Sequence, residues 1–172
     1  MKTRINKRRF FRSLPLMAII LLLMGCGGSQ GVITAEERQE LEELTQTVKS
    51  QEFEIINQWA DPQSGNNISL IGNTNYIRLE GETAEIFLPY YGVRHLGGGP
   101  GSEGGIKYEG PIENYMVEER MKQQDVLVSF EGRNEDNEHL KFLITLYPNG
   151  KANTSVTSSQ RSSITYRGEL ED

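Results

Sequence analysis

The chain has 172 residues, with 18 Lys and Arg against 24 Asp and Glu, and a formal net charge of −6. Six of the basic residues precede Cys26, so a chain that begins at Cys26 keeps 147 residues and 12 Lys and Arg against 24 acids, a charge of −12. Such an acidic chain repels phosphate backbones, which excludes nucleic acid as an expected partner and favours basic or neutral ones. The length is that of one domain with a real core.

Residues 1–25 have the layout of a bacterial export signal, with a basic start followed by an apolar run over 14–24. The run is about half the roughly 20 apolar residues that a transmembrane helix needs. Leu23, Met24, Gly25 and Cys26 resemble a lipobox. The resemblance implies cleavage before Cys26, a diacylglyceryl thioether on its sulfur and a third acyl chain on the new amino terminus. Several acyl chains would anchor the protein stably to a membrane.

Two alternatives to lipidation remain open: a plain signal peptide with an incidental cysteine, and an uncleaved short anchor. Cys26 is the sole cysteine. Once it is lipidated, no thiol remains for disulfides, thiolate catalysis or metal binding. We therefore expect a signal peptide over 1–25, a flexible lipidated tether over 26–33, an amphipathic helix over 34–50 and a β-rich domain over 51–172.

The helix is predicted from its capping residues and its apolar spacing. Thr34 followed by Glu37 is the signature of a capping box, and Leu41, Leu44 and Val48 share one helical face. Two interpretations are open: a helix that docks on its own domain through these three residues, or a coiled-coil or partner-binding helix.

After residue 51 the apolar residues alternate with polar ones, and turn residues recur about every ten positions, which predicts an all-β fold. We expect an antiparallel meander of about 8–10 strands that forms a β-sandwich or a small barrel. The predicted strands are 53–59, 68–71, 76–79, 83–88, 106–109, 115–121, 126–130, 139–147, 152–157 and 164–170. Phe53, Ile55 and Trp59 are expected on one face of the first strand, and residues 132–138 are expected to form a loop.

The glycine-rich segment 92–105 is the candidate binding loop, because long irregular loops are often functional. Gly99, Gly101 and Gly104 match the G-x-G-x-x-G spacing of dinucleotide sites. That motif needs a preceding parallel strand and a following helix, whereas a strand is predicted here, so a dinucleotide cofactor is excluded. A plain surface loop is the alternative.

Aromatic residues gather in sequence around this segment. A platform for a glycan, a peptide or a lipid could be formed by Tyr90, Tyr91, Tyr108 and Tyr115, and His95, at the edge of the loop, is a further candidate ligand-binding residue. Trp59 could add to the platform. Core and cross-strand packing is the alternative role for such residues in β domains.

Signatures of catalysis and of metal binding are weak. His95 and His139 are too few for most zinc sites, and no serine stands in a nucleophile elbow. We therefore expect no metal and no cofactor. A glycosidase-like carboxylate pair such as Glu109 with Glu113 stays open, although neighbouring acids are common in so acidic a chain.

Residues 104–115 read GGIKYEGPIENY, and the segments 88–92, 148–150 and 162–168 read LPYYG, PNG and SSITYRG. In these segments the chain resembles the domain of unknown function 4251 (DUF4251), found in predicted lipoproteins of Bacteroidota. The resemblance spans about residues 51–170. It implies lipidation, an envelope location and a β-rich fold, and it brings no assigned activity or catalytic residue.

Three functional hypotheses follow. The first is a non-catalytic binding or interaction module, anchored by its lipid, that takes a protein, glycan or hydrophobic ligand at residues 90–115. The alternatives are a small envelope hydrolase that uses carboxylates and a structural subunit of an envelope assembly. In lipoproteins of this kind, acidic residues directly after the cysteine mark surface export. None follows Cys26 directly, so we expect the protein on the outer membrane, facing the periplasm.

Overall fold

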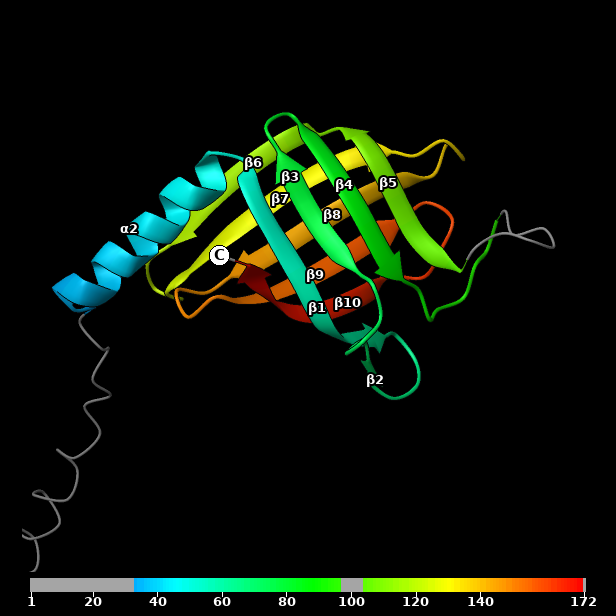
Figure 1. Ribbon diagram of the computed structural model, residues 1–172, viewed down its shortest axis with the longest axis horizontal. Coiled ribbons are helices and arrows are strands. Elements are labelled where there is room, and N and C mark those ends of the chain that lie inside the picture. The colour runs from blue at the N-terminus through cyan, green and yellow to red at the C-terminus, as the bar shows by residue number, and fades with distance from the viewer. Residues whose placement is uncertain (1–32, 97–103, 172) are drawn as a thin grey trace, which may run out of the picture. The chain divides into compact units, whose positions relative to one another are not determined.

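The computed structural model describes residues 33–96 and 104–171. Cys26, the tether up to residue 32, Gly99 and Gly101 lie outside these ranges. Within them, one helix precedes ten strands (Figure 1). The elements are α2 (Ala35–Lys49), β1 (Glu52–Pro62), β2 (Ile68–Ser69), β3 (Tyr76–Glu80), β4 (Thr83–Pro89), β5 (Gly105–Pro111), β6 (Glu113–Arg120), β7 (Asp125–Arg133), β8 (His139–Leu146), β9 (Lys151–Ser158) and β10 (Ile164–Glu171).

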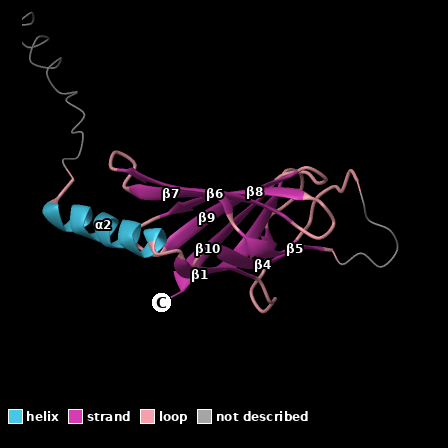
Figure 2. Cartoon of the chain, turned by 90° about the horizontal axis from the view of Figure 1, so that it is seen from above, coloured by secondary structure: helices cyan, strands magenta, loops and turns pink. Residues whose placement is uncertain are grey.

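All the strands belong to one antiparallel sheet that is nearly closed into a barrel. The order across the sheet is β5-β4-β3-β1-β10-β9-β8-β7-β6, and the short β2 pairs with β1. The first long strand therefore lies beside the last one. Figure 2 shows the sheet folded over on itself, with β6, β7 and β8 above β1, β4 and β5. The predicted all-β meander is confirmed, and of the two expected architectures the fold is the barrel-like one.

The sheet comes close to closing where β5 meets β7. Tyr108 on β5 is buried and packs over Gly132 on β7, where a Cβ atom would clash with the tyrosine ring. The Tyr108 hydroxyl donates a hydrogen bond to the carbonyl oxygen of Pro111. A glycine in a strand often marks such a close approach. Gly132 is therefore the residue that lets the two sides of the barrel meet.

The core fills the inside of the curved sheet. On β8, Leu140, Phe142, Ile144 and Leu146 are all fully buried, while the residues between them face outward. This alternation follows from the two-residue period of a strand. Phe142 stacks on Phe130 of β7 with ring centroids 4.8 Å apart. Side chains thus occupy the centre of the domain.

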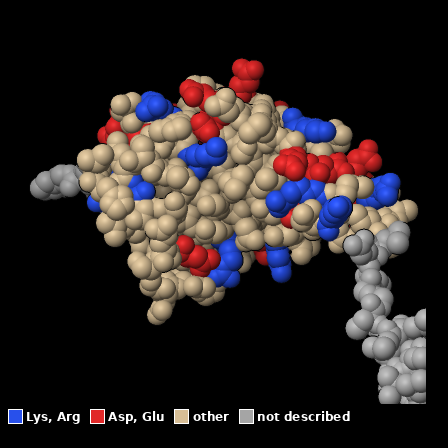
Figure 3. All heavy atoms as spheres, turned by 180° about the vertical axis from the view of Figure 1, so that it is seen from behind, with Lys and Arg blue, Asp and Glu red and all other residues tan. Residues whose placement is uncertain are grey.

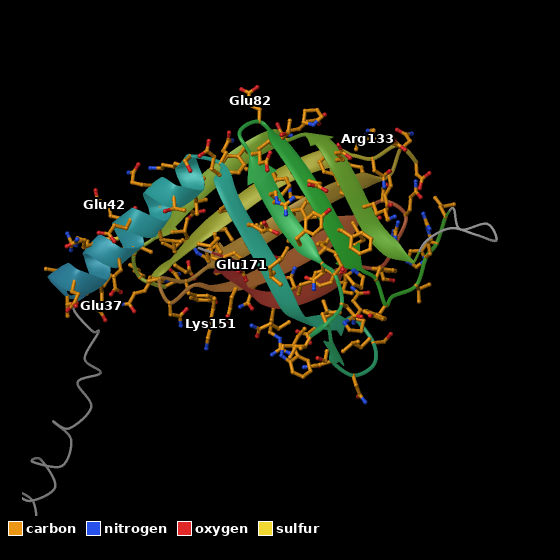
Figure 4. All side chains as sticks on the ribbon, viewed as in Figure 1. Glu37, Glu42, Glu82, Arg133, Lys151 and Glu171 are labelled. Carbon is orange, nitrogen blue, oxygen red and sulfur yellow. The ribbon has the colours of Figure 1, made fainter. Side chains whose placement is uncertain are left out.

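Helix α2 is docked on the sheet. The predicted capping box is present, because Glu37 N donates to Thr34 Oγ1 at 3.1 Å and Thr34 N donates to Glu37 Oε2 at 2.8 Å. Leu41, Leu44 and Val48 are buried, and the helix contacts β1, β6 and β7. Its acidic residues are exposed, and Figure 4 shows Glu42 pointing away from the barrel. In the part of the chain that the structure describes, no helix has the length and apolarity to cross a membrane.

One local prediction is wrong, and a second is right only in part. Trp59 does not share the inner face of Phe53 and Ile55, because the pairing of β1 with β10 shifts between Asn57 and Trp59. This β-bulge turns Trp59 outward, where it is 37% exposed, and places Ala60 inside. The loop predicted over 132–138 is shorter than expected, because β7 continues to Arg133 and pairs with β8 up to His139. The other strands differ from prediction mainly at their ends.

Candidate functional site

An open cleft of about 440 Å³ lies on the outer face of β3, β4 and β5. Its volume is within the usual range for small-ligand sites. These three strands lie side by side at the front of Figure 1. The cleft is lined by Tyr76, Glu85, Ile86, Phe87, Lys107, Tyr108 and Glu109 from the strands and by Asn134, Glu135 and Asp136 from the loop between β7 and β8.

Strand alternation explains which side chains face the cleft. Ile77, Ile86 and Ile106 point into the core, so their neighbours along each strand point outward. Those neighbours are Tyr76, Glu85, Phe87, Lys107 and Glu109, all half-buried or exposed. The loop 134–138 then forms a wall beside the outward face.

The lining is predominantly negative. Glu85 and Glu109 are direct partners in the β4–β5 pairing, and Glu135 and Asp136 add two carboxylates from the loop. Like charges that stand opposite each other across two strands destabilise the pair. Among the described residues of the lining, Lys107 is the cation, and its Nζ lies 5.4 Å from the centre of the Phe87 ring. Arg78 offsets part of the charge of Glu85, whereas Glu109 faces the cleft opposite it.

Hydrogen bonds hold Glu85 in place. Its carboxylate accepts from the Tyr76 hydroxyl at 2.5 Å and from Arg78 Nη1 at 2.9 Å. Arg78 also pairs with Glu54, Nε to Oε2, at 3.0 Å. The hydrogen bond to Glu85 raises the pKa of Tyr76, so the phenol stays protonated and continues to donate. Tyr76 therefore presents a fixed aromatic ring beside the carboxylates.

A buried ion pair supports the loop that walls the cleft. Arg161 Nε and Nη2 donate to the two carboxylate oxygens of Glu138 at 2.7 and 2.9 Å, and both side chains are almost inaccessible. Arg161 Nη1 also donates to the carbonyl oxygen of Gly105 at 2.8 Å. Asn134 Nδ2 donates to Glu138 at 3.2 Å, and the Ser158 hydroxyl donates to it as well. The pair thus joins the β7–β8 loop, the β9–β10 loop and the start of β5.

The pKa of Glu138 reflects two opposing effects. Burial raises it, because a charged carboxylate loses its hydration. Hydrogen bonds from Arg161 and Ser158 and the positive charge of Arg161 lower it more strongly, so the net shift is downward from the ordinary value. Glu138 is therefore ionised at neutral pH, as a bidentate pair with an arginine requires.

The predicted residues Tyr90, Tyr91 and His95 are not among the residues that line the cleft, and Tyr90 contacts this ion pair. The Tyr90 ring is 5.2 Å from the Arg161 guanidinium, and its hydroxyl donates to the carbonyl oxygens of Val93 and Ser162, each at 2.9 Å. His95 Nε2 lies 3.2 Å from Ser162 Oγ. Tyr91 is 40% exposed. Burial raises the pKa of Tyr90, in keeping with a structural role as a hydrogen-bond donor.

The remaining predicted residues are dispersed. Tyr108 lies in the seam of the barrel and contributes to one side of the cleft. Tyr115 is half-buried at the helix, where its hydroxyl donates to the carbonyl oxygen of Val48 at 2.6 Å, and burial raises its pKa. Gly104 is exposed directly before β5. The predicted tyrosines are thus not gathered on one surface, and the role of these residues in ligand binding stays a prediction.

Two kinds of catalytic site can be compared with the structure: a Ser-His-Asp triad and a pair of carboxylates. Ser162 and His95 are paired, but within residues 33–96 and 104–171 no carboxylate is hydrogen-bonded to His95, so a Ser-His-Asp triad is not formed there. The predicted pair Glu109 and Glu113 is divided between two strands, since Glu113 pairs with Glu131 on the other side of the seam. Glu109 instead faces Glu85.

The arrangement of the carboxylates also bears on metal binding. Over the described ranges, no group of three or more His, Cys, Asp or Glu side chains is placed so that it could hold a metal ion. The four carboxylates of the cleft therefore line a surface rather than converge on a point.

Sequence reasoning missed most of the cleft. Alternation along β3, β4 and β5 could have placed Tyr76, Glu85, Phe87 and Lys107 on one outward face. Nothing in the sequence indicates that the loop 134–138 lies beside β5, because that contact depends on how the barrel closes.

The chain matches the family model described as "Domain of unknown function (DUF4251)" over residues 35–170. It is also similar to the crystal structure of a DUF4251 family protein from Bacteroides eggerthii DSM 20697, with 16% identity and a TM-score of 0.57 over 77% of this chain and 87% of that one. A likeness at this identity shows a shared fold. The comparison with curated proteins found no match. Because the family model spans helix α2 and nearly the whole barrel, the protein belongs to the DUF4251 family.

Proposed function

We propose that this protein is a non-catalytic binding module of the bacterial envelope, anchored by a lipid on Cys26, and that its cleft takes a ligand that carries positive charge. An amine or a basic peptide segment has this chemistry. The observation that supports the proposal is the lining of the cleft, which places Glu85 and Glu109 face to face and adds Glu135 and Asp136. The aromatic rings of Tyr76 and Phe87 offer apolar contact beside these charges.

The hydrogen bonds of Glu85 favour binding over hydrolysis. A glycosidase-like pair needs one carboxyl group that donates a proton to the leaving group. Glu85 accepts hydrogen bonds from both Tyr76 and Arg78, so it is arranged as an acceptor. Such an arrangement suits a site that presents fixed negative charge to a ligand.

The proposed anchor rests on the lipobox. Helix α2 begins at Ala35, nine residues after Cys26, so a lipid on Cys26 would place the domain close to the membrane surface. Substitution Cys26→Ser removes the acyl acceptor. We expect loss of acyl labelling and release from the membrane fraction. Unchanged fractionation together with unchanged labelling would contradict the anchor.

Calorimetric titration tests the cleft. The lipidated protein in an uncharged detergent is titrated with tetralysine peptide at low ionic strength. We expect binding that weakens as salt is added, because exposed charges are screened. Glu109→Gln should weaken it about two- to fivefold, the effect of one exposed ion pair.

The control variant is Glu42→Gln, which removes the same charge from the outer face of helix α2 (Figure 4). It should leave the affinity unchanged. Equal weakening by the two variants would show that tetralysine responds to the overall charge of the protein, and absence of binding would contradict a cationic ligand.

A further inference from the structure

A second surface lies on the opposite side of the barrel, on the outward face of β7, β8, β9 and β10. We call it the neutral face and define it by residues that are all uncharged: Leu127, Ser129, Leu143, Thr145, Asn153, Ser155, Thr157 and Thr165. Figure 3 shows uncharged surface between groups of charged side chains on this side of the molecule. The uncharged residues are therefore contiguous in three dimensions.

The neutral face is a part of the outward side of these strands, and charged residues hold the outward positions that border it: Glu131, Lys141, Lys151, Arg167 and Glu169. Outward positions on a half-exposed sheet accept charged residues readily. On the front of the same barrel, the equivalent positions hold Glu54, Arg78, Glu85, Lys107 and Glu109. The neutral face is thus an uncharged patch with a charged border, in a protein that carries twice as many acidic as basic residues after residue 25.

The face presents an array of available hydroxyl groups. Ser129, Leu143, Ser155 and Thr165 are successive partners across four strands, so their side chains form one row. The hydroxyls of Ser129, Thr145, Ser155, Thr157 and Thr165 have no hydrogen-bond partner among the described residues. They are therefore free to bond to solvent or to a polar ligand.

An aromatic residue stands at the end of the neighbouring row. This row crosses β8, β9, β10 and β1 and consists of the successive partners Thr145, Asn153, Arg167 and Trp59. The Arg167 guanidinium lies 5.8 Å from the Trp59 ring and donates to both carboxylate oxygens of Asp61, at 2.6 and 3.1 Å. The β-bulge that turns Trp59 outward therefore adds an indole ring and a fixed ion pair to the edge of the neutral face.

We propose that the neutral face, with Trp59 at its edge, binds an uncharged polysaccharide strand. Sugar hydroxyls would bond to the free Ser and Thr hydroxyls, while the apolar faces of the sugar rings would contact Trp59 and Leu143. Charge complementarity selects the occupant. An anionic polymer is repelled by the acidic protein. A cationic one finds carboxylates only at the border of the face, where Asp61 is paired with Arg167 and Glu131 with Lys141. This site is separate from the cleft and does not depend on the function proposed for it.

Fluorescence provides a direct test, because Trp59 is the only tryptophan of the chain. The lipidated protein in an uncharged detergent is titrated with cellohexaose and with chitin hexaose, and its removal from solution by insoluble cellulose, chitin and starch granules is measured. We expect a shift of the emission with at least one oligosaccharide and depletion by the corresponding polymer. Absence of both with all these probes overturns the proposal.

Two variants locate the interaction. Trp59→Ala and Ser155→Glu should each reduce the bound fraction at least fivefold. The matched control is Tyr91→Ala, which removes an aromatic ring of similar exposure (40% against 37%) away from the face and should bind as the parent does. Because Trp59→Ala could weaken folding, the emission shift in the unmodified protein stands as the independent measurement.

Self-association is the competing role for an uncharged face. Sedimentation analysis at increasing concentration detects it. A dimer that Ser155→Glu dissociates, in a protein that binds none of the polysaccharides, would assign the face to a second copy of this chain and overturn the proposal.

Discussion

Arg161 Nε lies 2.7 Å from Oε1 of Glu138, and this ion pair is buried at the end of the barrel where three chain segments meet. The two residues are 23 positions apart, on the two sides of the β8–β9 hairpin. Asn134, Ser158 and the carbonyl oxygen of Gly105 are further hydrogen-bond partners of the pair. It holds the loop 134–138 against β5 and so shapes the wall of the cleft.

Removing the charge of Glu138 should lower the free energy of unfolding. Glu138→Gln leaves the Arg161 guanidinium buried without its counter-charge, and breaking such a pair costs about 3–5 kcal/mol. Urea denaturation measures the loss of unfolding free energy.

The matched control is Lys141→Met, which breaks the exposed pair of Lys141 Nζ with Glu131 Oε1 at 3.1 Å. Exposed pairs contribute about 1 kcal/mol or less. If the two variants lose similar amounts of unfolding free energy, the buried pair does not have the structural role that we assign to it.

The same pair predicts an acid dependence of stability. The folded-state pKa of Glu138 is lowered from the ordinary 4.5, so the unfolded state takes up a proton first. The stabilisation is complete above pH 4.5 and is lost as pH falls through the lower, folded-state pKa. We expect the unfolding free energy of the parent to fall more steeply below pH 4.5 than that of Glu138→Gln. Parallel curves would show that Glu138 does not carry this effect.

Tyr115 is predicted to hold helix α2 on the barrel. Tyr115→Phe removes the hydroxyl that donates to the Val48 carbonyl oxygen and keeps the ring in place. A hydrogen bond of this kind contributes about 0.5–1.5 kcal/mol. Hydrogen exchange over residues 35–49 should become faster, while Tyr91→Phe, at an exposed tyrosine, should not change it. Unaltered exchange in Tyr115→Phe would contradict the docking role.

Gly168 is predicted to be irreplaceable on β10. It pairs with Asn57 beside the β-bulge, and a Cβ atom there would clash with the carbonyl oxygen of Ile56. Because the obstacle is backbone, Gly168→Ala should cost about 1–3 kcal/mol or more in a thermal or urea unfolding experiment. Gly104→Ala is the control, since a Cβ atom at Gly104 has no neighbour within 4 Å. Equal stability of the two variants would be inconsistent with this packing.

Alternation and turn residues were sufficient to predict the β-rich fold and its strands. Residues 139–147 show why, since Leu140, Phe142, Ile144 and Leu146 alternate with outward residues and a Pro148-Asn149-Gly150 turn follows. Trp59 shows the limit of that reasoning. One extra residue in the pairing of β1 with β10 moves every later side chain of β1 to the opposite face of the sheet. The local sequence contains no pattern that predicts such a bulge.

The residues of the candidate site were harder to predict from the sequence than the strands were. The tyrosines around the glycine-rich segment are neighbours in sequence, yet Tyr90 contacts Arg161 and Tyr115 contacts helix α2. The cleft instead combines β3, β4 and β5 with a loop that follows β7. Glu85 and Glu109 become partners only through strand register, which depends on long-range pairing.

The most direct test of the cleft is an NMR titration of isotopically labelled, lipidated protein with tetralysine in an uncharged detergent. We predict chemical-shift changes at Tyr76, Glu85, Lys107 and Glu109 and in the loop 134–136, with saturation at a common affinity. Changes confined to the acidic residues of helix α2, or no saturable changes in the cleft, would contradict the proposal that the cleft binds a cationic ligand.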